Sequence, residues 1–191
     1  MGRKYGSLHI RTENVTENTD ALISSCIDAM DSVFHMDVEK AAALLGLNLP
    51  QQQIPLLRQL TRVGISARTK QNVVKRNGFV SLYDQRVTFE NIQAVARKLS
   101  DLLKLPILYS SVYDDDVFIF GLCENGKTVS VHISGDCEAY GLTPESDNIE
   151  GLERYLSNDE GNLPELKNLS GADFESALSK ALGFRLDSND R

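Results

Sequence analysis

The sequence has few of the residues that usually carry catalytic chemistry, and those it has are widely separated. Its 191 residues include three cysteines and three histidines. Cys26, Cys123 and Cys137 stand at unrelated spacings with no CxxC pair, and the histidines form no HxH, HxxxH or HExxH pair. These spacings give no support for a zinc site. An odd number of scattered cysteines is typical of reduced thiols in a cytoplasmic protein.

Motifs for phosphate binding, nucleophilic catalysis and membrane targeting are also missing. The chain has no glycine-rich phosphate loop, and no serine or cysteine lies in a nucleophile motif. No apolar stretch approaches the roughly 20 residues needed to cross a bilayer. The first residues have no apolar run behind their charges, as a signal peptide would. We therefore expect a cytoplasmic protein with no cofactor, and we favour a non-enzymatic role over a catalytic one.

The composition is that of an ordinary globular protein. Hydrophobic residues make up 41% and charged residues 25% of the chain, which is enough to bury a core in one domain. We predict a single α+β domain over residues 1–191. Its parts are a first half (1–77), a central unit (78–135) and an acidic C-terminal part (136–186).

The clearest structural pattern lies in the central unit. Apolar residues recur at helical spacing from about Phe89 to Lys104, which predicts an amphipathic helix with one buried face. The Asn125-Gly126 dipeptide lies between two apolar runs and is a strong hairpin signal. The predicted strands of this unit are Phe79–Tyr83, Ile107–Tyr113, Val117–Cys123 and Lys127–Ile133.

The first half has a similar pattern in outline. Alternating apolar and polar residues predict a half-buried strand at Tyr5–Arg11, and helical spacing predicts a helix from about Asp20 to Phe34. Segments 5–34 and 78–104 match at a constant offset of 72 residues. We take this match as a hypothesis of two related strand–loop–helix units.

Three further elements complete the predicted fold. A helical insertion is expected at about 36–63, and the last helix at Phe174–Leu182. Asn77-Gly78 is expected to connect a preceding strand to Phe79–Tyr83 as a hairpin. Because the strands alternate apolar and polar residues, we expect a mostly antiparallel sheet with the helices packed on one face.

Charge is distributed unevenly along the chain, and this polarity motivates the preferred function. The net charge is −7, and residues 136–165 contain nine acidic residues and one basic residue. Such a segment would steer a basic partner and raise the association rate. We therefore expect a binding or regulatory protein of the immunity type that acts through a protein partner. The residues predicted to bind this partner are Glu145, Asp147, Glu150 and Glu153.

Nucleic-acid binding is a second hypothesis, based on residues 54–79, which hold six basic residues and no acidic one. No aromatic residues are interleaved with these cations, so phosphate contacts rather than base stacking are expected. The segment from Ala42 to Leu47 resembles the start of a winged helix-turn-helix domain, but Pro50 and Pro55 fall where the recognition helix should be regular. The candidate residues are Arg58, Arg62, Arg68, Lys70, Lys75 and Arg76.

A metal-dependent hydrolase is the third hypothesis. Asp84 and Asp114 each end a predicted strand, and Asp116 follows in the same acidic triplet. If the two strands were parallel neighbours, these carboxylates would emerge together and suit Mg²⁺ or Mn²⁺. The alternative is a tight turn, since Asp is favoured in turns for its local hydrogen bonds.

Overall fold

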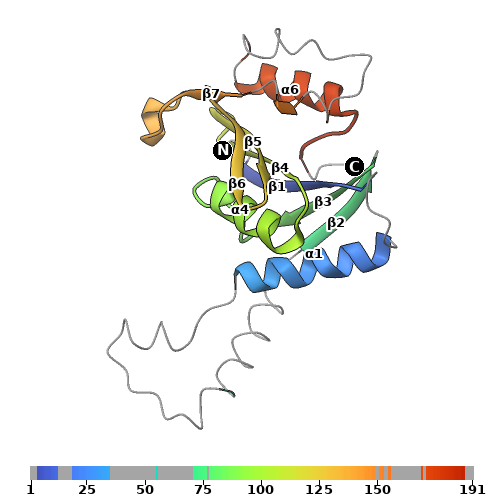
Figure 1. The fold of residues 1–191 in the computed structure, drawn as a ribbon. Helices are drawn as coiled ribbons and strands as arrows, with labels where there is room; N and C mark the ends of the chain where they lie inside the picture. The colour runs from blue at the N-terminus through green and yellow to red at the C-terminus, as the bar shows by residue number, and fades with distance from the viewer. Residues whose placement is uncertain are drawn as a thin grey trace.

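The computed structural model describes residues 4–12, 19–34, 71–76, 78–148, 151–152 and 171–187, together with residues 55, 155 and 169. Within these ranges the chain forms one seven-stranded sheet and three α-helices (Figure 1). The strands are β1 (Lys4–Arg11), β2 (Gln71–Arg76), β3 (Phe79–Asp84), β4 (Ile107–Tyr113), β5 (Val117–Glu124), β6 (Lys127–Gly135) and β7 (Glu145–Asp147). The helices are α1 (Thr19–Val33), α4 (Ile92–Leu103) and α6 (Gly171–Leu182), with a short 3₁₀ helix η1 (Glu138–Tyr140).

Every neighbouring pair of strands is antiparallel, in the order β2-β3-β1-β4-β5-β6-β7. The start of β1 pairs with the ends of both of its neighbours. Ser7 lies opposite Tyr83 of β3, and Lys4 lies opposite Tyr113 of β4. β3 and β4 therefore run in the same direction on either side of β1, and both end at the same end of the sheet. The predicted α+β class and antiparallel sheet are confirmed.

Short turns fix the register of the hairpins. The φ angles at Asn125 and Gly126 are 47° and 77°, the left-handed values that an Asn-Gly turn between two strands requires. The β4–β5 connection also uses left-handed angles, 54° at Asp114 and 63° at Asp115, which Asp tolerates better than most residues. The predicted hairpins at residues 125–126 and 77–78 are confirmed, because β5 pairs with β6 and β2 pairs with β3.

Helices α1 and α4 cover one face of the sheet (Figure 1). The buried stripe predicted for residues 89–104 is confirmed at Ile92, Val95, Ala96 and Leu99, but the helix begins only at Ile92 and Leu102 is exposed. Residues 88–91 form a turn instead, in which the Thr88 backbone N–H donates to the Asn91 side chain over 2.9 Å. The core on this face includes Leu22, Cys26 and Met30 of α1, Ile92, Ala96 and Leu99 of α4, and Leu8, Ile10, Val80, Tyr109 and Ile119 of the strands.

Helix α6 covers the opposite face, so the prediction that all helices pack on one face is wrong. Strands β4 and β5 are buried on both faces, and their second face needs a cover of its own. Apolar side chains of α6 and of the segment after it supply that cover. This second core includes Phe174, Leu178, Leu182, Phe184 and Leu186 together with Leu108, Val112, Phe118, Phe120 and Leu122.

The physical reason for the error lies in the buried polar residues of β1 and β6. Ser7 and His9, like Ser130 and His132, alternate with apolar residues and therefore resemble a solvent-facing side. All four are nevertheless at most 4% exposed. The His9 ring contacts Phe184, and the His132 ring stacks on Phe174. These polar positions are thus interior positions whose partners come from distant parts of the chain.

Two other predictions about the fold are not tested by the described residues. The helical insertion at 36–63 lies outside the described residues, apart from residue 55. The repeat of 5–34 and 78–104 is not shown, since two helices on the same face of a sheet are compatible with ordinary packing as well. No helix within the described ranges is both long and apolar enough to cross a membrane.

Candidate functional site

A pocket of about 530 Å³ opens at the end of the sheet where β1 begins between the ends of β3 and β4. Its lining comes from these three strands, from one residue of β2 and from the loop at residues 85–90. Several of the lining side chains are aromatic, namely Tyr5, Tyr83, Phe89 and Tyr113. The fold thus creates a hollow with aromatic walls from segments that are far apart in the sequence.

The Lys4 ammonium lies over the Tyr113 ring at this pocket. Its Nζ atom is 4.0 Å from the ring centroid and 3.1 Å from the Asp114 Oδ2 atom. Hydrogen bonding to Tyr113 and then to Asp114 raises the pKa of Lys4. The Phe89 ring lies beside the Tyr113 ring, with the two centroids 4.3 Å apart. A cation here therefore meets both an aromatic face and a carboxylate, a favourable combination.

Hydrogen bonds within the β3–α4 loop hold one wall of the pocket. The Asp84 Oδ1 atom accepts the backbone N–H of Arg86 at 2.8 Å, and the Asn91 side chain donates to the Arg86 carbonyl at 2.9 Å. The Thr88 hydroxyl donates to the Glu90 carboxylate at 2.9 Å. Short-range bonds of this kind fix where the Thr88 and Glu90 side chains stand at the pocket.

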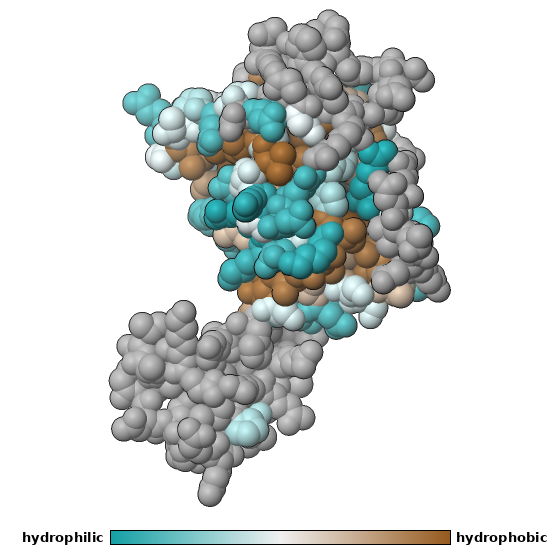
Figure 2. Space-filling view, in the orientation of Figure 1, coloured by the Kyte–Doolittle hydropathy of each residue, from teal (hydrophilic) through white to brown (hydrophobic). Residues whose placement is uncertain are grey.

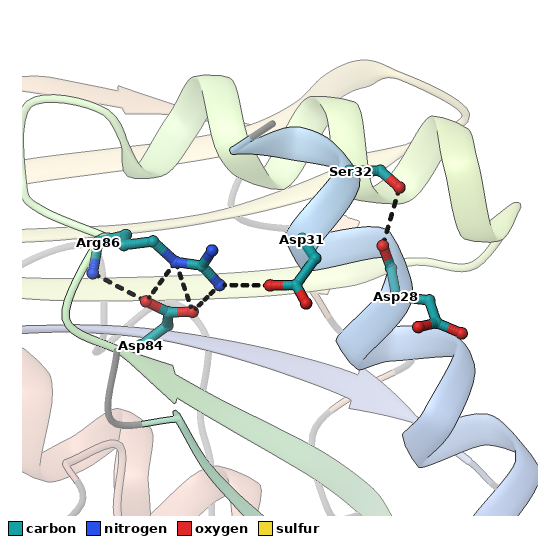
Figure 3. Close-up of polar contacts among 5 residues, drawn as sticks. All are labelled: Asp28, Asp31, Ser32, Asp84 and Arg86. Carbon is teal, nitrogen blue, oxygen red and sulfur yellow. Dashed lines mark hydrogen bonds and ion pairs between the residues drawn. The ribbon is translucent and has the colours of Figure 1, made fainter. Parts of the chain in front are cut away.

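Arg86 also joins two carboxylates from different elements (Figure 3). Its Nη2 atom is 2.6 Å from Asp84 Oδ2 and 3.1 Å from Asp31 Oδ1 of α1. The Asp84 side chain is 2% exposed and the Arg86 side chain 12%, and the guanidinium packs over the Phe34 ring at 4.7 Å. Because breaking such a buried pair strands a charge, these contacts tie α1 to the pocket wall.

A group of exposed carboxylates adjoins the pocket, and we call it the acidic corner. The Asp136 backbone N–H donates to the Asp116 carbonyl at 3.0 Å, which joins the β4–β5 turn to the end of β6. Tyr140 donates to the Asp116 carboxylate at 2.9 Å, which raises the pKa of Tyr140 to about 12. The Tyr140 ring is 5.0 Å from the Tyr113 ring of the pocket. The acidic corner consists of Asp115, Asp116, Asp136 and Glu138.

The three carboxylates predicted for a metal site each have a different partner. Asp84 is bound by Arg86, Asp114 by Lys4, and Asp116 by Tyr140. β1 lies between β3 and β4, so these strands are not neighbours. Among the described residues, no group of three or more His, Cys, Asp or Glu side chains is placed to hold a metal ion. The metal-dependent hydrolase stays a prediction that these contacts do not favour.

The residues predicted for a protein partner and for nucleic acid fall at opposite edges of the sheet where they are described. Glu145 is exposed on the edge strand β7, which also contains Asp147. Lys75 and Arg76 belong to β2 at the other edge. The remaining candidates lie outside the described residues: Glu150, Glu153, Arg58, Arg62, Arg68 and Lys70.

A buried serine–histidine cluster against the segment after α6 was not anticipated from the sequence. The His9 ring nitrogens lie 3.0 Å from the Ser7 Oγ atom and 2.8 Å from the Ser81 Oγ atom. The Ser7 hydroxyl also donates to the Leu186 carbonyl at 2.9 Å. All three side chains are 0% exposed. The cluster therefore fastens the segment after α6 to the sheet and is out of reach of a substrate in solvent.

The pocket itself was also missed from the sequence. Its residues follow no spacing rule, since they come from segments as distant as Lys4 and Tyr113. The one available signal was that Tyr83 and Tyr113 each precede an aspartate at a strand end. The chain matches no protein-family model, no curated protein and no solved structure.

Proposed function

We propose that this protein is a non-enzymatic binding or regulatory protein that takes a basic region of a protein partner at the acidic corner and the adjoining pocket. The observation that supports this function most is the contact between the two features. Tyr140 bonds to Asp116 of the acidic corner and packs on Tyr113 of the pocket. A partner seated on the corner therefore has a hollow with aromatic walls directly beside it.

Charge supports the same choice of partner. The chain carries a net charge of −7, and exposed Glu145 on β7 adds to the four carboxylates of the acidic corner. A surface of one sign steers an oppositely charged partner and raises the association rate more than the final affinity. Salt should therefore weaken the association strongly, because it screens exposed charges.

The polar character of the surface fits recognition by charge rather than by a broad apolar patch. Leu102, at 54% exposure, is the large hydrophobic side chain most open to solvent among the described residues. Figure 2 shows hydrophilic residues interspersed with hydrophobic ones on the described part of one face. Nucleic-acid binding is not carried further, because four of its six candidate residues lie outside the described ranges.

The first prediction is that charge reversal at this surface abolishes capture of the partner. The tagged wild-type protein is used to recover partners from a lysate of its source cells at low salt. The triple variant Asp136→Lys, Glu138→Lys and Glu145→Lys should lose a partner that the wild type retains, because the partner's basic region then meets cations.

A matched control separates this local effect from the change in net charge. The triple variant Asp20→Lys, Asp28→Lys and Asp101→Lys changes the net charge equally, at exposed positions on α1 and α4. This control should keep the partner. Equal loss in both variants, or retention in both, would remove the acidic surface from the proposal.

A further inference from the structure

We propose that the strand-end pocket receives one lysine side chain of the partner, and that Lys4 is an internal competitor for this site. The proposal rests on the function above and names the group that the pocket recognises. It follows from the contacts of Lys4, from the charges around the pocket and from the position of the acidic corner beside it.

The Lys4 ammonium already makes the contacts that the ammonium of a partner lysine would make. A primary ammonium on an alkyl chain lies 4.0 Å from the Tyr113 ring centroid and 3.1 Å from an Asp114 carboxylate oxygen. The Lys4 side chain is still 42% exposed in this position. It therefore sits at the mouth, where an incoming ammonium would compete with it for the same ring and carboxylate.

The volume and walls of the pocket leave room for a second lysine side chain beside Lys4. The pocket holds about 530 Å³ and is lined by aromatic rings that can pack along an alkyl stem. Gly6 lets the loop at residues 85–90 pack closely on β1, because a Cβ atom there would lie 2.9 Å from the Val87 side chain and carbonyl oxygen. A side chain entering beside Lys4 therefore finds both room and apolar contact.

The charges around the pocket favour a cation. The Tyr5 hydroxyl donates to Glu175 at 2.6 Å, and the Tyr83 hydroxyl donates to the Asp187 carbonyl at 3.2 Å. Glu175 is only 8% exposed and lies behind Tyr5, whereas the Asp187 carboxylate is paired with Arg185 at 3.0 Å and adds no net charge. Exposed Glu90 stands at the pocket itself. The Glu90 carboxylate at the pocket and the Asp114 carboxylate beside Lys4 therefore favour an ammonium over an anion.

The acidic corner indicates that the lysine belongs to a protein chain rather than to a free amine. Basic residues next to the bound lysine would reach Asp115, Asp116, Asp136 or Glu138 through the Tyr113–Tyr140 contact region. A free polyamine would also be attracted, and the experiment separates the two sources.

The test is a titration of the full chain followed by backbone amide NMR. The probes are a synthetic Arg-Gly-Lys-Gly-Arg peptide with blocked ends, the same peptide with Nε-acetyl-lysine, and spermidine. The lysine peptide should shift the amides of residues 4–6, 85–90 and 113. Acetylation removes the charge and should weaken binding at least about tenfold, because the ammonium then loses its ring and carboxylate contacts. Spermidine should bind more weakly than the lysine peptide.

Two variants test the role assigned to Lys4 and one tests the ring. Lys4→Met should bind the lysine peptide about fivefold more tightly, since the internal competitor is gone. Lys98→Met removes one exposed charge on α4 as a matched control and should change the affinity less than about twofold, because screened surface charges act weakly at a distance. Tyr113→Leu should weaken binding at least about fivefold. If Tyr113→Leu does not fold, Glu90→Gln replaces it, because this exposed substitution removes a carboxylate from the pocket and should also weaken binding of the lysine peptide.

Several results would overturn the proposal. Equal binding of the acetylated peptide would show that the pocket does not read an ammonium. Tighter binding of spermidine than of the lysine peptide would show that the pocket takes a free amine. Equal effects of Lys4→Met and Lys98→Met would show that only the overall charge of the protein matters. The titration needs no partner, so its failure leaves the lysate result intact. If the triple charge-reversal variant still captured the partner while the lysine peptide bound normally, only the proposed function would be overturned.

Discussion

At the scale of single residues, His132 is a side chain whose environment departs clearly from that in water. Its ring lies parallel to the Phe174 ring with centroids 3.8 Å apart, and its Nδ1 atom is 3.4 Å from the Ser146 Oγ atom of β7. Its Nε2 atom is buried without a hydrogen-bond partner. Burial lowers the pKa of His132 to about 4, because a charged imidazole there would lose its hydration.

This gives a prediction about stability and pH. In the unfolded chain the pKa of histidine is about 6.5, so between pH 6.5 and 4 the unfolded state binds the proton more readily than the folded state. The free energy of unfolding should therefore fall as pH is lowered through this window, by an amount on the order of 3 kcal/mol from this group. Urea unfolding of wild type and His132→Phe at several pH values measures it.

The comparison isolates His132 from the other titrating groups. Phe at position 132 can keep the stack on Phe174 but cannot be protonated, so the variant should lose stability less steeply below pH 6.5. Parallel curves for the two proteins would show that His132 is not held neutral by the fold.

At the scale of elements, the contact between α1 and the β3–α4 loop depends on the buried Asp84–Arg86 pair. Arg86→Met would leave the Asp84 carboxylate, 2% exposed, without its guanidinium partner. We predict a loss of about 3 kcal/mol in the free energy of unfolding, as for other broken buried pairs. Denaturant unfolding of the purified variant provides the measurement.

Asp31→Asn serves as the matched control for this pair. The Asp31 side chain is 27% exposed and its pairing is screened by water, so its loss should cost less than about 1 kcal/mol. The double variant Asp84→Asn with Arg86→Met should recover part of the stability, since no charge is then stranded. An equal loss in the free energy of unfolding for Asp31→Asn and Arg86→Met would contradict the larger contribution assigned to the buried Asp84–Arg86 pair.

The elements that local pattern encodes were predictable, and those that distant contacts decide were not. The strand pattern and the Asn125-Gly126 turn are set by neighbouring residues, and they appear in the structure as predicted. The position of α6 depends on whether Ser7 and His132 face solvent or protein, and alternation alone cannot distinguish a solvated serine from a buried, hydrogen-bonded one. The pocket was beyond prediction because its walls meet only after β1 inserts between β3 and β4.

At the scale of the whole molecule, the faces of the sheet pack against helices, and one end of the sheet forms the proposed binding surface. The acidic corner and the pocket lie at the end of the sheet where β3 and β4 finish, whereas α1 and α4 cover one face and α6 the other. Helix packing and the proposed partner binding therefore use different parts of the same sheet. Variants at exposed corner residues should alter binding while leaving both cores intact.

The measurement that tests this account most directly is hydrogen–deuterium exchange of the full chain with and without the partner captured at low salt. We predict that partner binding slows exchange at residues 4–6, 85–90, 113–116 and 136–140, which surround the pocket and the acidic corner, because the partner covers these backbone amides. Protection confined to α1, α4 or β2, with no change around the pocket, would contradict the account.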